Sequence, residues 1–415
     1  MLAKLRLDPR MAVSTPTEIA AVRQILADVA DRGDAALVEV SRKFDDPNFS
    51  AAQIRVAPEE MRQAALRLPE NQRSAIRRSI AQVREYQSHI MPVAPEPLKR
   101  PGVELTLRFV PIDSVGLCVP GGKAAYPSTL IMLAVPAQVA GVRRIVVCSP
   151  PSQFGRSDIV LATCHELGLS EVFRAGGAAA VGAMAFGTST ILPVDKIVGP
   201  GNAYVQHAKR AVAGFVGIDG FLGPSEILTL ADDSGHADFI AADLLAQAEH
   251  DPGSCYLLTD SQPLADAVVS ELKRQVAALS RTGAILPALR DRSAIVVGAS
   301  MDELIALANE FACEHVNLQT RDDAAMLARL TNGGAIFVGP YSPVAAGDYI
   351  AGPSHCLPTN TTARFASGVS VYEFLKRVSV EKYDASGLAA DAAAIITLAN
   401  AESLDAHAAS VKVRT

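Results

Sequence analysis

The segment Val115-Gly116-Leu117-Cys118-Val119-Pro120-Gly121-Gly122 joins a short apolar run of β-strand type to a glycine-rich turn that precedes a helical stretch. Gly176-Gly177-Ala178 and Gly199-Pro200-Gly201-Asn202 follow the same plan. Such turns expose backbone N–H groups at a helix N-terminus, where a phosphate can bind. None is a dinucleotide fingerprint or a Walker loop, and a turn without a ligand explains any single one equally well. Three of them in one α/β unit favour a dinucleotide crevice at the carboxyl ends of the strands.

Short apolar runs alternate with helical stretches from residue 110 onward, which is typical of parallel sheets covered by helices. The predicted strands are residues 115–119, 145–148, 171–174, 196–198, 227–230, 255–259, 294–297, 316–319 and 335–338. Nine strands are too many for one mononucleotide-binding half. We therefore expect an α/β protein with two packed Rossmann-like units and a break near residues 219–226.

Helical patterns dominate both ends of the chain. Thr15-Pro16-Thr17-Glu18 has the residues of a capping box with proline at the first helical position, and Gly33 can end that helix. Further helices are expected at residues 34–44, 58–68, 70–88, 371–376 and 389–409. The early helices have modest apolar faces, which suggests that they pack on something else, such as another subunit. A long polar loop follows Tyr341, and such a loop is usually functional.

Composition bounds the class of protein. A chain of 415 residues is long enough for two or more domains. The net charge is −6 without a Lys/Arg block, which argues against nucleic acid as a partner. The six cysteines include no Cys-x-x-Cys pair and are expected to be buried thiols in a reducing compartment. The N-terminus lacks a secretory pattern, and the longest apolar run, residues 129–142, is too short to span a bilayer. We expect a cytoplasmic protein with no membrane contact.

The segment Leu-Leu-Ala-Gln-Ala-Glu-His-Asp-Pro at residues 244–252 carries the first candidate metal ligands. Gln247 and His250 are three residues apart and therefore share one face of the last helical turn. Asp251-Pro252 ends the helix, because proline cannot continue it. An amide oxygen beside an imidazole is a plausible half of a zinc site. A histidine at a helix end is more often a capping or surface residue, so other ligands must come from elsewhere.

Glu314-His315, just before a predicted strand, is the candidate for proton transfer. A histidine can take a hydroxyl proton near neutral pH, and a glutamate can activate water. A surface Glu-His pair is the commoner explanation of this dipeptide alone.

Two other places offer polar side chains. The loop after Tyr341 contains Asp348 and His355, and the aspartate is an oxygen ligand that can complete a metal site. Glu402 and His407 lie near the end of the chain, where a lone histidine is usually solvent-exposed.

Longer motifs closely resemble the histidinol dehydrogenase family over nearly the whole chain, and motifs of this length in this order do not arise by chance. They are Gly121-Gly122 with Tyr126-Pro127-Ser128, Val194-Asp195-Lys196-Ile197-Val198-Gly199-Pro200-Gly201-Asn202-Ala203-Tyr204-Val205, Gly217-Ile218-Asp219, Gly223-Pro224-Ser225-Glu226, Gln247-Ala248-Glu249-His250-Asp251-Pro252, Glu314-His315, Gly347-Asp348-Tyr349, Ser354-His355 with Leu357-Pro358-Thr359, and Ala406-His407.

The resemblance implies an NAD-dependent enzyme with one Zn2+ per subunit, working as an intertwined homodimer with shared active sites. Members of the family oxidise an amino alcohol, L-histidinol, to L-histidinal and then to L-histidine, the last step of histidine biosynthesis. Carried over by motif, the zinc ligands would be Gln247, His250, Asp348 and His407, the last from the partner subunit. Zinc would hold the substrate and would not activate the hydride directly.

Catalytic roles follow from the same resemblance. His315 would remove the alcohol proton as hydride leaves to NAD, and Glu314 would activate water for attack on the aldehyde. No cysteine stands where a thiohemiacetal nucleophile is needed, so a covalent step is the less favoured mechanism. The substrate-binding residues would be Ser225, Gln247, His250, His315, Asp348, His355, Glu402 and His407.

The expected domain division combines the strand pattern with the resemblance. It comprises an N-terminal arm at residues 1–20, a larger α/β domain of residues 21–115 with 228–368 that carries the zinc and catalytic residues, a smaller Rossmann-like cofactor domain at residues 116–227, and a C-terminal helical tail at residues 369–415 that reaches the partner.

The cofactor positions are where this sequence departs from the family. Cys118 stands where the family usually has tyrosine, Ala179 stands where it usually has glutamine, and Asn202 is retained. Each loss could cost roughly 1 kcal/mol of NAD affinity. Three hypotheses follow: a histidinol dehydrogenase, a paralogue that oxidises another amino or polar alcohol with altered cofactor binding, or a non-catalytic zinc-binding relative. The retained Glu314 and His315 argue against the third.

Overall fold

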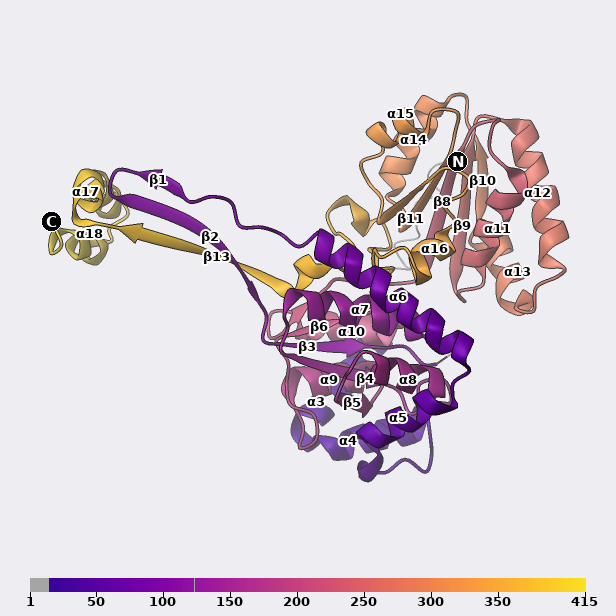
Figure 1. Cartoon of the computed structure of the whole chain (residues 1–415), viewed down its shortest axis with the longest axis horizontal. Helices are drawn as coiled ribbons and strands as arrows, with labels where there is room; N and C mark the ends of the chain where they lie inside the picture. Colours follow the sequence, from indigo (N-terminus) through magenta and orange to yellow (C-terminus); the bar gives the residue numbers. More distant parts are fainter. Residues whose placement is uncertain (1–14, 123) are drawn as a thin grey trace.

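Two five-stranded parallel sheets and a projecting arm make up the part of the chain that the structure describes, residues 15–122 and 124–415 of a computed structural model (Figure 1). The helices are α3 (Pro16–Arg32), α4 (Asp34–Phe44), α5 (Pro58–Arg67), α6 (Glu70–His89), α7 (Pro127–Ala140), α8 (Asp158–Glu166), α9 (Gly177–Phe186), α10 (Ala203–Val212), α11 (Ala237–Ala248), α12 (Gln262–Val276), α13 (Thr282–Asp291), α14 (Met301–Phe311), α15 (Asp323–Arg329), α16 (Val344–Tyr349), α17 (Ala385–Ala401) and α18 (Asp405–Lys412). The strands are β1 (Leu98–Arg100), β2 (Val103–Pro111), β3 (Ser114–Cys118), β4 (Arg144–Ser149), β5 (Glu171–Arg174), β6 (Lys196–Val198), β7 (Gly217–Ile218), β8 (Ser225–Ala231), β9 (Gly253–Thr259), β10 (Ala294–Val297), β11 (His315–Gln319), β12 (Ala335–Val338) and β13 (Leu375–Tyr383). Short 3-10 turns lie at Ala51–Gln53, Thr362–Arg364 and Val371–Phe374.

Both parallel sheets have the strand order of a doubly wound fold. The first runs β5-β4-β3-β6-β7 and the second runs β10-β9-β8-β11-β12. In each sheet the chain starts at the central strand, builds one side, and then crosses to the other. The nine predicted strands are confirmed as β3 to β6 and β8 to β12, while two-residue β7 is too short to show a pattern. The predicted break is also confirmed, because residues 219–224 link the two sheets.

The N-terminal helices pack on the first sheet, which corrects the expected grouping of residues 21–115 with residues 228–368. Val22, Leu26 and Phe49 share a buried core with Val146 and Phe173. Among the described residues, the two core clusters of the second sheet draw their buried members from residues 227–344. Helices α3, α5 and α6 each bury only three or four side chains. α3 packs on α9, α5 on α8 and α6 on α7, and all three partners belong to the first unit. A modest apolar stripe shows that a helix has a partner without showing which one.

Only the last six residues of the expected N-terminal arm, residues 15–20 of 1–20, belong to the described part of the chain. Residues 1–14 lie outside the described residues. α3 begins at Pro16, and Thr15 and Glu18 form the predicted capping box, with Gly33 ending the helix.

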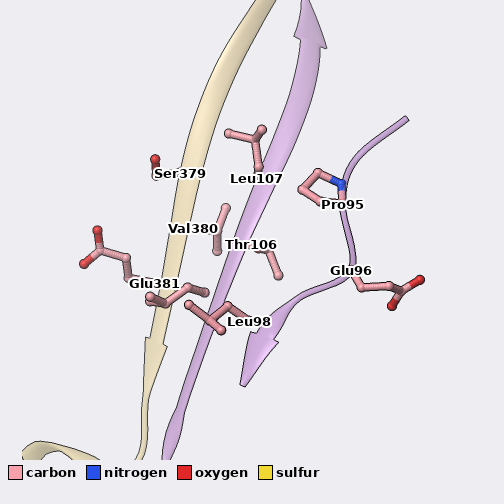
Figure 2. A pocket seen from close by; sticks show the side chains of 9 residues that line it. Pro95, Glu96, Leu98, Thr106, Leu107, Ser379, Val380 and Glu381 are labelled. Atoms are coloured by element: carbon pink, nitrogen blue, oxygen red, sulfur yellow. The ribbon is translucent and has the colours of Figure 1, made fainter. Parts of the chain in front are cut away.

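A three-stranded antiparallel sheet, β1-β2-β13, forms the projecting arm and carries α17 and α18 at its far end (Figure 1). The helical tail expected at residues 369–415 is correct for α17 and α18, but the helix expected at residues 371–376 is wrong from Leu375 on, because Leu375–Tyr383 pairs with Val103–Pro111 along nine residues. β13 is mostly exposed, so its side chains show no buried face that would mark a strand. Figure 2 shows a hollow on this sheet, whose lining includes Leu98, Leu107 and Val380 beside Pro95.

Two expectations about composition can be compared with the structure. All six cysteines are free and buried, as predicted. Within residues 15–122 and 124–415, no helix is long and apolar enough to cross a membrane.

We expect Leu37→Ala in α4 to destabilise the first sheet by about 2 to 5 kcal/mol, because Leu37 is 1% exposed in the core that α3 and α4 share with that sheet. Leu66→Ala is the matched control, because Leu66 is 58% exposed. Urea unfolding measures the cost, and hydrogen exchange locates it. Loss of protection in β8 and β9 with β3 and β4 unaffected would contradict the grouping of α4 with the first sheet.

Candidate active site

The amino ends of β8 and β11 bring the two predicted catalytic residues to one place. The strands are parallel, with His315 opposite Ile227, so Glu314 comes to face Glu226. The backbone N–H of Glu226 donates to Glu314 Oε2 at 2.8 Å, and His315 Nδ1 lies 3.0 Å from the carbonyl oxygen of Glu226. A carbonyl oxygen only accepts, so Nδ1 carries the proton of this hydrogen bond. In the neutral ring, Nε2 is then the basic nitrogen.

The Nε2 nitrogen of His315 faces Asp348, one of the predicted zinc ligands. His315 Nε2 lies 3.7 Å from Asp348 Oδ1, is buried, and has no hydrogen-bond partner among the described residues. The ring of Phe337 lies 5.9 Å from the imidazole, centroid to centroid, and covers it. Glu314 Oε2 lies 3.4 Å from Nδ1 on the other side. The imidazole is therefore held between two carboxylates, with one nitrogen left for a ligand.

Burial and neighbouring charges shift the pKa values of His315, Asp348 and Glu226. Burial lowers the pKa of His315, but the carboxylates of Glu314 and Asp348 outweigh burial and raise it to about 10. Burial raises the pKa of Asp348, but the interaction with nearby His315 and the charges of the other histidines outweigh burial and lower it. Burial and the charge of Glu314 raise the pKa of Glu226 to about 8. Perturbed groups gathered in this way are typical of a catalytic centre.

The end of α11 supplies the two predicted ligands of the 244–252 segment. Gln247 is 1% exposed in the last turn, and its Nε2 has no hydrogen-bond partner among the described residues. His250 stands just past the helix with an exposed side chain, and removal of water from part of its ring lowers its pKa. A Cβ at Gly253 would lie 2.0 Å from the carbonyl oxygen of Gln247, so only glycine lets β9 start this close to the helix end.

α16 places Asp348 beside these two residues. Helices α11 and α16 are in contact, and Asp243 of α11 accepts a backbone hydrogen bond from Val344 of α16 while burial raises its pKa to about 6. Asp348 and His250 lie close enough for each charge to shift the pKa of the other. The structure thus brings His250 and Asp348 to one side of Glu314 and His315, and Gln247 lies three residues before His250 at the end of α11. Their role as zinc ligands stays a prediction.

These donors suit zinc but do not complete its site within one chain. Imidazole nitrogen and carboxylate oxygen are zinc ligands, and an amide oxygen can join them. Among the described residues, no three His, Cys, Asp or Glu side chains gather as a metal site by themselves. Of the four predicted ligands, only His250 and Asp348 are residues of these types that lie near the two sheets. Gln247 is an amide, and His407 lies in α18 at the tip of the arm (Figure 1).

His355 bridges the two sheet-bearing units at the site. Its Nδ1 lies 2.8 Å from the backbone oxygen of Asp348, and its Nε2 lies 3.1 Å from Thr129 Oγ1, at the start of α7. Ser79 Oγ of α6 donates to the backbone oxygen of Tyr349 at 2.6 Å. The polar loop is therefore held on both sides, which makes it an ordered wall of the site.

The other predicted substrate residues divide into two groups. Ser225 is half-buried at the first position of β8, beside the catalytic pair. Glu402 and His407 are exposed at the α17–α18 end of the arm, far from Ser225 in the same chain (Figure 1). Within one chain, the predicted site residues between Ser225 and His355 lie together, whereas Glu402 and His407 lie apart from them.

Two of the three predicted cofactor positions lie at the switch point of the first sheet, and the third, Ala179, lies in α9 after edge strand β5. Cys118 ends β3, and Asn202 closes the turn after neighbouring β6, so both stand at the carboxyl edge where doubly wound sheets bind ligands. Asn202 is exposed, and its Oδ1 accepts from the N–H of Val205 as the cap of α10. Cys118 and Ala179 are buried, and burial raises the pKa of the Cys118 thiol to about 12.

Two residues beside the site were not singled out from the sequence. Glu226 holds both catalytic side chains through its peptide groups, and Thr129 contacts His355. Glu226 stands in the Gly-Pro-Ser-Glu motif, and a charged residue inside an apolar strand was the signal that could have identified it. Thr129 lies in an apolar helix and gave no such signal.

Comparisons with known proteins agree over the whole chain. A family model described as histidinol dehydrogenase matches residues 9–415. The histidinol dehydrogenase of Rhodopirellula baltica is 46% identical over 402 residues, which cover 97% of this chain and 87% of that protein. The one from Geobacillus kaustophilus is 46% identical over 396 residues, or 95% and 92% of the two chains. The crystal structure of histidinol dehydrogenase from Elizabethkingia anophelis superposes with a TM-score of 0.94 at 34% identity and covers 100% of this chain and 95% of that chain.

We expect Asp348→Asn to lower the pKa of His315 in metal-free protein, because Asp348 is one of two carboxylates that raise this pKa to about 10. A folded-state pKa above the ordinary 6.5 gives stability that is complete below about pH 6.5 and is lost as pH rises through about 10. The variant should therefore lose less stability across that interval. NMR of the imidazole nitrogens measures the pKa, and urea unfolding measures the stability. Exposed Asp302→Asn is the control, and an unchanged His315 pKa in Asp348→Asn would contradict the expectation.

Proposed function

The chain belongs to the histidinol dehydrogenase family, and from that membership we propose that it oxidises L-histidinol to L-histidine through L-histidinal, with zinc bound and two NAD as oxidants. The observation that carries the proposal is the buried Glu314–His315 pair, whose free Nε2 faces Asp348. A binding protein without activity has no need of a buried acid and base held in this way. A cytoplasmic location stays a prediction.

When bound, NAD supplies the hydride acceptor for both oxidations, and zinc, held by Gln247, His250, Asp348 and the His407 of a second copy, supplies an anchor for the substrate. The remaining steps depend on the residues of the chain.

In the first oxidation, His315 acts as the base. The hydrogen bond from Nδ1 to the backbone of Glu226 orients the ring, so Nε2 takes the hydroxyl proton as the adjacent carbon loses hydride. In metal-free protein Asp348 helps to keep the ring protonated. A cation on Asp348 would withdraw that support and lower the pKa of His315 toward the neutral base.

In the second oxidation, Glu314 activates water. Its Oε2 is held by the N–H of Glu226, so we assign Oε1 to take the proton of the water that attacks the aldehyde carbon. As water attacks, the carbonyl oxygen takes the proton that His315 gained in the first oxidation, which gives the hydrate and returns His315 to the neutral base. The hydrate then loses a hydroxyl proton to His315 and hydride to the second oxidant, which leaves the carboxylic acid. Because the two side chains lie 3.4 Å apart, both oxidations can take place in one pocket without release of the aldehyde.

We propose that the site is completed by a second copy of the chain. His407 and Glu402 are exposed at the tip of an arm that projects away from His250 and Asp348 (Figure 1). An arm of this kind can reach a partner in an intertwined dimer, and each subunit would then supply two residues to the site of the other.

A second candidate is a paralogue that oxidises another amino or polar alcohol with altered cofactor binding. It is favoured by the burial of Cys118 and Ala179, which leaves Asn202 as the one exposed member of the three cofactor positions.

We expect the zinc-loaded protein to form two equivalents of NADH per L-histidinol, because both oxidations share one site. Absorbance at 340 nm measures the product, and a chelator should remove the activity until zinc is returned. If the protein binds zinc and forms the dimer but produces no NADH from L-histidinol, the result would favour the paralogue with another substrate.

We expect His315→Asn to lower kcat by about 100-fold to 10,000-fold, because it removes the base of both oxidations. Zinc content should stay unchanged, since His315 is not an assigned ligand. Metal analysis and steady-state kinetics on the same sample separate the two effects. An unchanged kcat in His315→Asn would contradict the role of His315 as the base.

We expect His407→Ala and His250→Ala chains to complement each other in a mixed dimer, because one of its two sites would be intact. The purified heterodimer should show about half of the unchanged activity and a statistical mixture about a quarter, while each variant alone is inactive. Absence of recovery in a verified heterodimer would show that all ligands come from one chain.

A further inference from the structure

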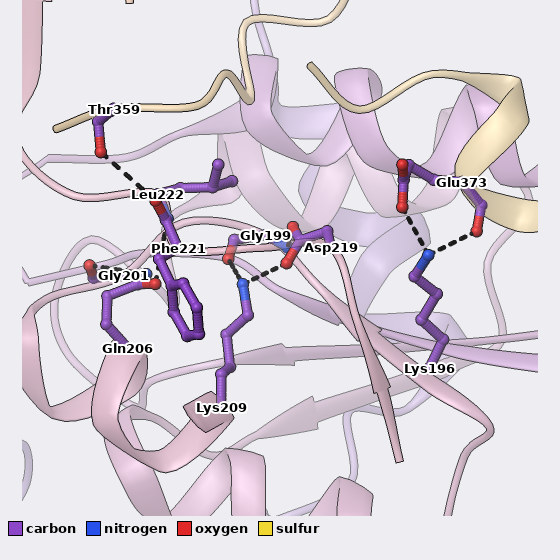
Figure 3. A network of polar contacts seen from close by, with 10 residues as sticks. All are labelled: Lys196, Gly199, Gly201, Gln206, Lys209, Asp219, Phe221, Leu222, Thr359 and Glu373. Carbon is purple, nitrogen blue, oxygen red and sulfur yellow. Dashed lines mark hydrogen bonds and ion pairs between the residues drawn. The ribbon is translucent and has the colours of Figure 1, made fainter. Parts of the chain in front are cut away.

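A fully buried ion pair lies beneath the turn that follows β6. The side chains of Lys209, in α10, and Asp219, directly after β7, are both 0% exposed, and Lys209 Nζ contacts Asp219 Oδ1. Lys209 Nζ also donates to the carbonyl oxygen of Gly199 at 3.0 Å. Asp219 Oδ2 accepts from the N–H of Gly199 at 2.6 Å. Figure 3 shows that the ion pair thus holds both backbone polar groups of one glycine.

Gly199 begins the turn that reaches Asn202. It directly follows β6, has a φ of +115°, and a Cβ there would lie 2.4 Å from the carbonyl oxygen of Cys118. Only glycine therefore lets this turn lie against the end of β3. The place between β3 and β6 is the switch point of the first sheet, where a doubly wound fold binds a dinucleotide.

The same network ties the linker between the two sheets to this turn. The N–H of Leu222 donates to Gln206 Oε1 at 3.1 Å, and Gln206 Nε2 donates to the carbonyl oxygen of Gly201 at 3.3 Å. One residue further on, the N–H of Gly223 donates to Thr359 Oγ1 at 2.7 Å. The linker then enters β8 at Ser225, so the turn and the amino end of β8 are held by one set of contacts.

Stability alone does not explain a buried ion pair at this place. Removal of two charges from water is costly, and well-packed apolar residues of similar volume often give an equally or more stable protein. What apolar side chains cannot supply is one acceptor for the N–H and one donor for the C=O of Gly199. The pair is therefore suited to orienting a backbone segment.

We propose that Lys209 and Asp219 are positioning residues that hold the Gly199–Asn202 turn in the conformation that binds the dinucleotide. The inference rests on the proposed use of NAD and adds two residues that touch neither substrate nor cofactor. They act through the peptide groups of Gly199, so their removal should weaken cofactor binding more than substrate binding.

The test is the double variant Lys209→Met with Asp219→Asn, which removes both charges and keeps an acceptor for the N–H of Gly199. We expect the Kd for NAD by calorimetry and the KM for NAD to rise about tenfold, as loss of one hydrogen bond in the binding conformation implies. The KM for L-histidinol should change by less than about twofold. A folded double variant with an unchanged Kd for NAD would overturn the proposal.

Lys196→Met is the matched control. Lys196 starts the same strand, β6, and its Nζ donates to Glu373 Oε2 at 2.5 Å and to the carbonyl oxygen of Glu373 at 2.8 Å (Figure 3). It lies at the opposite end of β6 from Gly199, so its loss should leave the Kd for NAD unchanged. An equal rise of Kd in the control would show a general loosening of the sheet and would also overturn the proposal.

Asp219→Asn alone is the second variant, because it retains the lysine and loses one of two accepted hydrogen bonds. An intermediate rise of the Kd for NAD is expected. Failure of both variants to fold would assign the pair to folding and not to positioning. Failure of the proposed function is a separate result, because it would show as absence of NAD binding in the unchanged protein.

Discussion

The parallel pairing of β8 with β11 is the constraint on which the active site depends. Its register places the peptide groups of Glu226 against both Glu314 and His315, with the N–H on the carboxylate and the C=O on the imidazole. Backbone atoms inside a sheet hold their positions more rigidly than side chains do. The side chains proposed as acid and base are thus oriented by the sheet itself, and the free nitrogen of the imidazole is determined by which backbone group the ring meets.

The short linker at residues 219–224 decides how the two sheets face each other. It runs from the end of β7 to the start of β8, so the carboxyl edge of the first sheet lies near the amino edge of the second. The first edge is where a doubly wound sheet binds a dinucleotide, and the second carries Glu314 and His315. Contacts of Gln206 and Thr359 with the linker, and of His355 with Thr129, hold these edges together. Hydride donor and acceptor would then meet between the two units.

The arm gives the structure its second constraint. β2 and β13 pair along nine residues, although more than 250 residues separate them in the chain, and they carry α17 and α18 away from both sheets. The side chains assigned to zinc and substrate are consequently divided between the body of the molecule and the tip of the arm. In the proposed dimer, a site divided in this way would link activity to assembly, because each subunit would need residues of the other.

Local pattern in the sequence determined the nine main strands, the capping box at Thr15, the break between the sheets and the buried thiols. The motifs identified the family and its candidate residues, because these lie in contiguous segments. The tertiary structure alone decided that α3 to α6 belong to the first sheet, that residues 375–383 form a strand, and that Glu226, Lys209 and Asp219 hold the site. The reason is physical: periodicity along a chain reports that one face is buried, whereas the partner on that face depends on residues far away in sequence.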